Sequence, residues 1–261
     1  MMRHIRTGSL VAGVVITLVV AAVAVAFWPA PRGVAQSPEP LLQYPDFPPT
    51  PTVGPNPTTA PSLAGTTLFS SRFDGPAALD AWKLVDLEFV LSDSRSNWGI
   101  TPEGRLEQQT TGRAFNPSIQ RTAALTGSAD WRDYRVQVSF YDQFNGTAGL
   151  IARYQGDDPT TASYYRYAII KDSFEATPKQ VLEKIERGVA TTLVAIPGPG
   201  FEERTWNVLQ LEVVGNTITV TLNGQVVIEA EDAAPLISGK AGIYTRAIGG
   251  IFFDDVSVTT P

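Results

Sequence analysis

The chain has 261 residues, no cysteine and a single histidine, His4. A Ser-His-Asp triad beyond residue 4, disulfides, thiolate nucleophiles and zinc–thiolate sites are therefore excluded, and a metal site would need oxygen ligands, which suit calcium or magnesium. Subtracting Arg3, Arg6 and Arg32 from the 20 basic residues leaves 17 against 26 acids from residue 36 onward, a net charge of −9. That balance argues against nucleic acid or anionic lipid as the main partner.

Residues 1–35 have the pattern of an export signal or a membrane anchor. A basic start is followed by the uncharged apolar stretch Leu10–Trp28, and this length favours a retained transmembrane helix, which needs about 20 residues. The small residues at Gly33–Ala35 resemble a cleavage site, so a signal peptide cleaved after Ala35, which gives a secreted protein, is the alternative. Two arginines precede the span and one follows it, which predicts an outward-facing domain.

The segment 36–65 contains nine prolines. Proline fixes φ and lacks an amide donor, so the segment cannot join a sheet or a helix. We expect an extended, disordered stalk; a ligand for a proline-binding groove is the alternative.

Residues 66–261 alternate short β-type runs with turn signals. The clearest hairpin is "TITVTLNGQVVIEA", in which Asn223-Gly224 fits a type I′ turn. The stretch between Pro178 and Gly188 offers only about two helical turns, so a strand paired with Ala190–Ile196 is favoured over a helix. About a dozen short strands predict an all-β fold, one large antiparallel β-sandwich or jelly roll.

The order of motifs in this domain resembles a known superfamily. From "FDGPAALDAWKL" through "WRDYRVQVSF", "AGLIARYQGDD" and "SYYRYAI" to "SGKAGIYTRAIGGIFFDDVSV", the chain is similar to the concanavalin A-like lectin/glucanase superfamily. It lies close to the laminin G-like and 3-keto-disaccharide-hydrolase-type jelly rolls. The resemblance covers about Leu68–Thr259 and implies that carbohydrate binds on a concave sheet.

Period-2 alternation then assigns side chains to the two faces of each strand. Val136, Val138 and Phe140 are predicted to face the core, as are Tyr165 and Tyr167. In "AGLIARY" the charge of Arg153 assigns its side chain to the open face. The predicted carbohydrate-binding surface comprises Arg135, Gln137, Tyr141, Arg153, Tyr164, Arg166, Tyr244 and Arg246; a plain solvated sheet face is the alternative.

The sequence lacks the Glu-x-Asp-x-x-Glu pattern that glucanases of this superfamily carry. Glu183 and Glu186 would point to opposite faces of one strand, so they are interpreted as surface charge. The resemblance to 3-keto-disaccharide hydrolases identifies a similar "G-x-x-x-R" strand at Gly149–Arg153, but the following strand has no glutamate partner for it. A non-catalytic role is therefore expected.

Sandwiches of this superfamily often hold a structural calcium ion where the first and last strands meet. The resemblance implies Asp74 and Asp254 as ligands, and strict alternation along the last strand would let only one of Asp254 and Asp255 coordinate. The alternative is that Asp74 shapes a turn and Asp254 makes local hydrogen bonds.

We therefore expect an extracytoplasmic lectin-like module that binds a polysaccharide or other glycan and touches the membrane only through its N-terminal helix. The stalk and the lack of cysteine suit a bacterial envelope protein. One alternative is a structural or protein-interaction sandwich with a partner at the cell surface. Another is a glycoside-acting enzyme whose acids come from separate strands.

Overall fold

A computed structural model of the chain describes residues 65–89, 95–109, 121–144, 146–171, 179–198, 200–246 and 249–261. All of them belong to Thr52–Pro261, the second of the two units into which the chain divides. The predicted span at 10–28 and the stalk, apart from Gly65, lie outside the described residues. Within the described ranges, no helix is long and apolar enough to cross a membrane.

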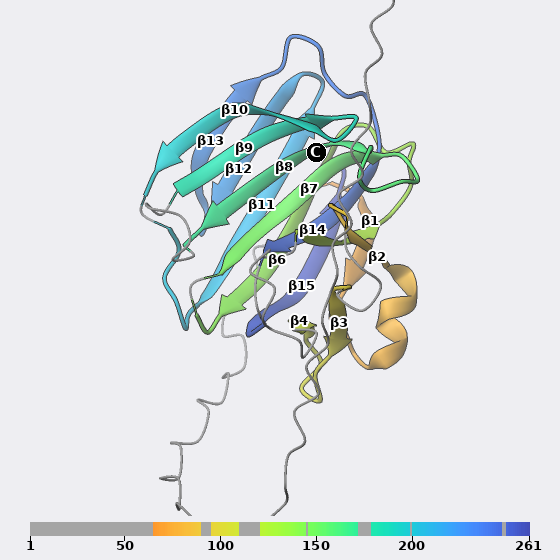
Figure 1. The fold of residues 1–261 in the computed structure, drawn as a ribbon, viewed down its shortest axis with the longest axis vertical. Helices are drawn as coiled ribbons and strands as arrows, with labels where there is room; N and C mark the ends of the chain where they lie inside the picture. Colours follow the sequence, from red (N-terminus) through yellow and green to blue (C-terminus); the bar gives the residue numbers. More distant parts are fainter. Residues whose placement is uncertain are drawn as a thin grey trace, which may run out of the picture. The chain divides into compact units, whose positions relative to one another are not determined.

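The described chain forms two antiparallel sheets that are stacked as layers (Figure 1). The eight-stranded sheet runs in the order β13-β12-β11-β6-β15-β4-β3, with β1 paired to β15. Its strands are β1 (Thr67–Ser71), β3 (Asn97–Ile100), β4 (Leu106–Gln109), β6 (Tyr134–Asp142), β11 (Trp206–Val214), β12 (Thr217–Leu222), β13 (Gln225–Glu231) and β15 (Ile251–Thr259).

The second sheet has seven strands in the order β10-β9-β8-β7-β14-β5-β2. They are β2 (Lys83–Asp86), β5 (Thr122–Thr126), β7 (Thr147–Gln155), β8 (Ser163–Ile170), β9 (Lys179–Glu186), β10 (Val189–Pro197) and β14 (Lys240–Arg246). A short 3-10 helix, η1 (Pro76–Ala81), precedes β2. The predicted antiparallel β-sandwich is confirmed.

The main core lies between the two sheets, where alternate side chains of facing strands meet. From β6 it takes Val136, Val138 and Phe140, and from β8 it takes Tyr165 and Tyr167, as alternation predicts. These two β8 phenols have hydrogen-bond partners, since Tyr165 donates to Asp232 Oδ2 (2.7 Å) and Tyr167 to Gln180 Oε1 (2.7 Å). Their rings therefore fill the core without leaving the hydroxyl groups unsatisfied.

Two local predictions are also confirmed. The segment after Pro178 is a strand, β9, and it pairs with β10 in antiparallel register. The β12–β13 hairpin turns at Asn223-Gly224, where both residues have positive φ (50° and 79°) as a type I′ turn requires.

Candidate functional site

Four of the eight predicted binding residues lie on the outer face of the seven-stranded sheet. They are Tyr164 and Arg166 on β8 and Tyr244 and Arg246 on β14. This face carries a second buried cluster, separate from the main core, made of Val85, Leu87, Ala123, Leu125, Ile151, Tyr154, Ala162, Tyr164, Ala168, Ile170, Val181, Ile185 and Tyr244. Tyr164 stacks on Tyr154 with ring centroids 5.4 Å apart, and burial raises the pKa of Tyr164 to about 12, so its hydroxyl stays protonated.

Three of the predicted residues lie on the other sheet. Arg135, Gln137 and Tyr141 belong to β6, which pairs with β11 and β15 and not with β7, its successor in the chain. The chain crosses between sheets after β6, so the prediction of one surface holding all eight residues is wrong. Arg135 forms an ion pair with Glu212, its cross-strand neighbour in the register.

The prediction that Arg153 faces the open surface is also wrong. A β-bulge interrupts the pairing of β7 between Ala152 and Gln155, and Arg153 adopts a positive φ of 51°. The extra residue reverses the alternation, so Tyr154 joins the outer cluster while Arg153 is 1% exposed.

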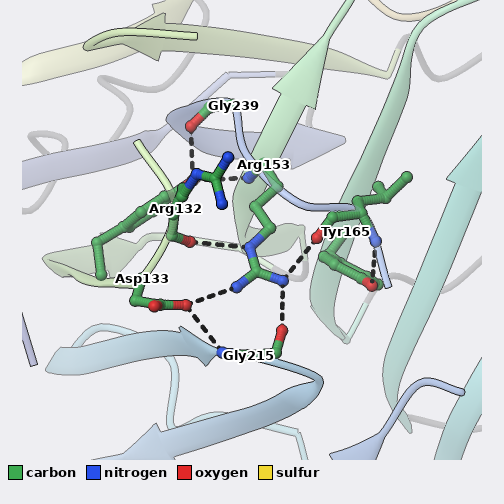
Figure 2. A network of polar contacts seen from close by, with 8 residues as sticks. Arg132, Asp133, Arg153, Tyr165, Gly215 and Gly239 are labelled. Atoms are coloured by element: carbon green, nitrogen blue, oxygen red, sulfur yellow. Dashed lines mark hydrogen bonds and ion pairs between the residues drawn. The ribbon is translucent and has the colours of Figure 1, made fainter. Parts of the chain in front are cut away.

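Arg153 is instead held by a set of oxygen atoms that come from separate segments of the chain (Figure 2). Its guanidinium donates to Asp133 Oδ1 (3.0 Å) and to three backbone carbonyls, those of Arg132 (2.9 Å), Gly215 (2.8 Å) and Leu236 (2.6 Å). The charge is thus fully engaged in joining segments that are distant in the sequence, and this role is structural.

A pocket of about 290 Å³ opens on the outer face of the seven-stranded sheet. It includes Arg166, Tyr244 and Arg246 of the predicted surface, but not Tyr164. We call it the outer-face pocket; its lining residues are Arg121, Thr147, Arg166, Ala168, Ile170, Lys179, Val181, Glu183, Thr192, Ala195, Tyr244 and Arg246.

The Arg166 side chain has two partners within this lining. Arg166 donates through Nε (3.1 Å) and Nη2 (2.6 Å) to Glu183 Oε2 on β9, its neighbour in the register. On its other side, the guanidinium carbon lies 4.9 Å from the centroid of the Tyr244 ring. Burial raises the pKa of Tyr244, so it too remains a neutral phenol.

Three charged lining residues, Arg121, Lys179 and Glu183, were not predicted as site residues. The interpretation of Glu183 as surface charge is wrong, since its side chain is 18% exposed and bound to Arg166. The prediction that Glu183 and Glu186 point to opposite faces of their strand is confirmed. Glu183 bonds to Arg166, whereas Glu186 is exposed and bonds to Lys184, which lies two residues away on the same face of β9 as Glu186. Only the β8–β9 register could have identified Glu183, since the partner charge lies 17 residues away.

The candidate calcium ligands lie near the pairing of the first and last strands, which do meet as β1 and β15. The register of β15 shifts after Asp254, where Asp255 has a positive φ of 48°. Two residues, Asp254 and Asp255, therefore lie between the core residues Phe253 and Val256, and the strict alternation of side chains predicted for this strand fails there. Asp254 Oδ1 accepts from the N–H of Asp255 (2.8 Å), and burial raises the pKa of Asp254. The described residues contain no group of three or more His, Cys, Asp or Glu side chains suited to a metal.

Residues 68–259 match the family model described as a 3-keto-alpha-glucoside-1,2-lyase-like domain. A protein of unknown function with a galectin-like fold from Bacillus subtilis is 14% identical with a TM-score of 0.59, over 75% of this chain and 96% of that one. The carbohydrate-binding module CBM66 from Bacillus subtilis is 16% identical with a TM-score of 0.50, over 68% and 95%.

A third similar structure is the Bacillus licheniformis β-glucanase, at 13% identity and a TM-score of 0.50 over 76% of this chain and 100% of that one. Comparison with curated proteins finds no significant match. At these identities the structures share the fold, which is lectin-like and concanavalin A-like.

Proposed function

Because the chain belongs to the family of 3-keto-α-glucoside-1,2-lyase-like domains, we propose that its sandwich binds a saccharide in the outer-face pocket, without catalysis. The observation that carries the proposal is the pocket itself. Several strands of the seven-stranded sheet, distant from one another in the sequence, contribute polar side chains to its lining. Its volume of about 290 Å³ is at the lower end of the range for ligand sites, roughly 300–1,000 Å³. That size suits one or two sugar rings of a longer glycan.

The lining offers both kinds of hydrogen-bonding group that sugar hydroxyls require. Arginine and lysine side chains can only donate, Glu183 accepts, and the exposed Thr192 can do both. Sugar hydroxyls are donors and acceptors at once, so a mixed lining of this kind matches them better than a purely cationic one.

The proposal is supported by two similar structures, one a carbohydrate-binding module and the other a protein with a galectin-like fold. We also propose that residues 1–35 anchor the domain to the outside of the cell membrane and that the proline-rich segment 36–65 is its stalk. The composition of these segments is the basis for this part of the proposal.

A decisive test is binding of the full chain to a broad panel of oligosaccharides, beside the double variant Arg166→Gln, Glu183→Gln. This change removes both charges together, so neither is left buried without a partner. The matched control is Arg135→Gln, Glu212→Gln, the corresponding cross-strand pair of the other sheet. Binding by the parent and the control, and not by the pocket variant, supports the proposal when all three melt cooperatively.

Loss of binding in the control variant alone would move the site to the eight-stranded sheet. If the parent protein binds no oligosaccharide of the panel, the proposal is overturned and a protein-interaction module at the cell surface is favoured.

A second candidate is catalysis on a keto-sugar, because the family description names a lyase and Glu183 supplies a carboxylate to the pocket. Elimination from a 3-keto-glucoside requires a base to remove the proton next to the carbonyl group. Incubating the full chain with a 3-keto-glucoside and following its breakdown tests this candidate, and Glu183→Gln should abolish any turnover that depends on the pocket.

A further inference from the structure

Among the lining residues that the structure describes, the charged side chains of the outer-face pocket are mostly cationic. Arg121, Arg166, Lys179 and Arg246 face one carboxylate in the described lining, that of Glu183. The domain as a whole has the opposite sign, since residues 66–261 hold 17 Lys and Arg against 24 Asp and Glu, the 26 acids of the chain less Glu39 and Asp46. The described lining of the pocket therefore concentrates positive charge on an acidic domain.

This concentration is a product of the fold. Arg121 directly precedes β5, Lys179 begins β9 and Arg246 ends β14, and antiparallel pairing brings these strand ends to one pocket. Arg121 also contacts Glu88, but both side chains are well exposed (46% and 31%) and the atoms are 3.4 Å apart. A pair of that kind is weak and easily exchanged for another anion.

The aromatic content of the pocket points the same way. Among the described lining residues Tyr244 is the one aromatic side chain, and Arg166 already lies over its ring at 4.9 Å. Tyr244 is also only 2% exposed, so its ring cannot stack on the apolar face of a pyranose, which is how neutral sugars are usually held. Charge is the stronger remaining source of affinity.

We infer that the outer-face pocket selects an acidic saccharide, one whose carboxylate or sulfate group lies among these cations. The inference rests on the proposed saccharide-binding function and narrows its ligand class. Although the domain is acidic overall, charges beyond about 8 Å are screened at physiological ionic strength. The local cations therefore outweigh the distant carboxylates for a group inside the pocket.

The test compares two probes of equal length on the full chain, an oligogalacturonide and its methyl ester, in which a methyl group on each carboxyl removes the charge. A sulfated oligosaccharide and its desulfated form give a second such pair, and inorganic sulfate serves as a free anion. We expect each charged probe to bind at least about tenfold more tightly than its neutral partner. Raising the salt from about 0.05 M to about 0.5 M should remove most of that difference.

Two pocket variants, Arg246→Gln and Lys179→Gln, should each weaken binding of the charged probe by a larger factor than binding of the neutral probe, and so reduce the preference. The control is Lys83→Gln, which removes one exposed positive charge from β2, the edge strand of the same sheet and not part of the pocket. A preference retained in both pocket variants, or lost in the control, would contradict the inference.

The outcomes separate this inference from the proposed function. Equal binding of charged and neutral probes that is lost with Arg166→Gln, Glu183→Gln overturns the acidic-ligand inference and keeps the saccharide site. Binding of inorganic sulfate as tight as that of the oligosaccharides, with no binding of neutral probes, overturns both.

Discussion

Tyr244 and Arg166 touch across a strand that separates them. Tyr244 lies on β14 and Arg166 on β8, and β7 runs between the two. The ring reaches the guanidinium because Gly149 of β7, the register partner of Tyr244, has no side chain. A Cβ at Gly149 would lie 2.8 Å from Tyr244 Cδ1 and 2.2 Å from the carbonyl oxygen of Tyr167, and both distances are too short for a real contact.

Replacing Gly149 with alanine should therefore push Tyr244 away from Arg166 and strain the β7–β8 pairing. We expect a loss of about 1–3 kcal/mol in the free energy of unfolding, as for other overpacked sites, together with loss of saccharide binding. Gly224→Ala is the control: a Cβ there meets nothing within 4 Å, although the positive φ of 79° carries its own cost. Both variants should lose stability, but only Gly149→Ala should lose binding; full binding by Gly149→Ala would refute the argument.

Arg153→Lys should destabilise the domain by roughly 3–5 kcal/mol, the cost of breaking a buried charged network. A lysine can donate from one nitrogen only, so it cannot reach three backbone carbonyls and Asp133 in different directions. Denaturant unfolding measures the loss. The control is Arg187→Lys, at an exposed arginine with nearly the same φ (50° against 51°); equal unfolding midpoints for the two variants would contradict this role.

Asp142 should make the domain less stable as the pH rises. Its carboxylate accepts from the N–H groups of Phe144 and Gly146 (both 2.9 Å), but burial outweighs these bonds and raises the pKa of Asp142 to about 6. A raised carboxyl pKa means that the folded state holds the proton more tightly than the unfolded state. Stability from this group is therefore greatest below about pH 4 and falls by about 3 kcal/mol by the time the pH has passed 6.

Asp142→Asn removes this titration, so its unfolding free energy should change less with pH than that of the parent across the same window. An amide keeps one acceptor oxygen and loses the other, which adds a cost that does not depend on pH. The slope against pH is the measurement, and parallel profiles for the two proteins would rule out a role for Asp142.

Asp232 should show the opposite dependence. Burial alone would raise its pKa, but the N–H of Ala234, the hydroxyl of Tyr165 and the ammonium of Lys184, whose Nζ lies 3.0 Å from Oδ2, together hold the pKa below its usual value. Stability from a lowered carboxyl pKa is present above the ordinary value of about 4 and is lost as the pH falls through the folded one. Asp232→Asn should therefore destabilise the domain most at neutral pH, and the difference from the parent should shrink in acid.

The limits of the sequence prediction lie at strand pairings and bulges. Alternation correctly placed Val136, Phe140 and Tyr165 in the core, because it depends only on the residues of one strand. It failed at Arg153, since one bulged residue reverses every face that follows it along β7. It also could not assign β6 and β7 to different sheets, because that depends on long-range pairing.

The same distinction between single-strand patterns and long-range pairing applies to the lining of the pocket. Arg166, Tyr244 and Arg246 were predicted from residue type and parity, and the pocket contains all three. Glu183 was missed because its relation to Arg166 exists only through the β8–β9 register. Whether any of these residues binds a saccharide stays a prediction.

The pairing of β1 with β15 brings the two ends of the domain together. Thr67 is the register partner of Thr259, and Thr66 and Thr260 exchange hydrogen bonds of 2.9 Å. A short loop could therefore join Pro261 to Gly65, and new ends could be opened at the Asn223-Gly224 turn without cutting a strand. In such a circularly permuted domain the outer-face pocket would be unchanged. The new chain ends would lie at the β12–β13 turn, at the β13 edge of the eight-stranded sheet, so a stalk would be attached there.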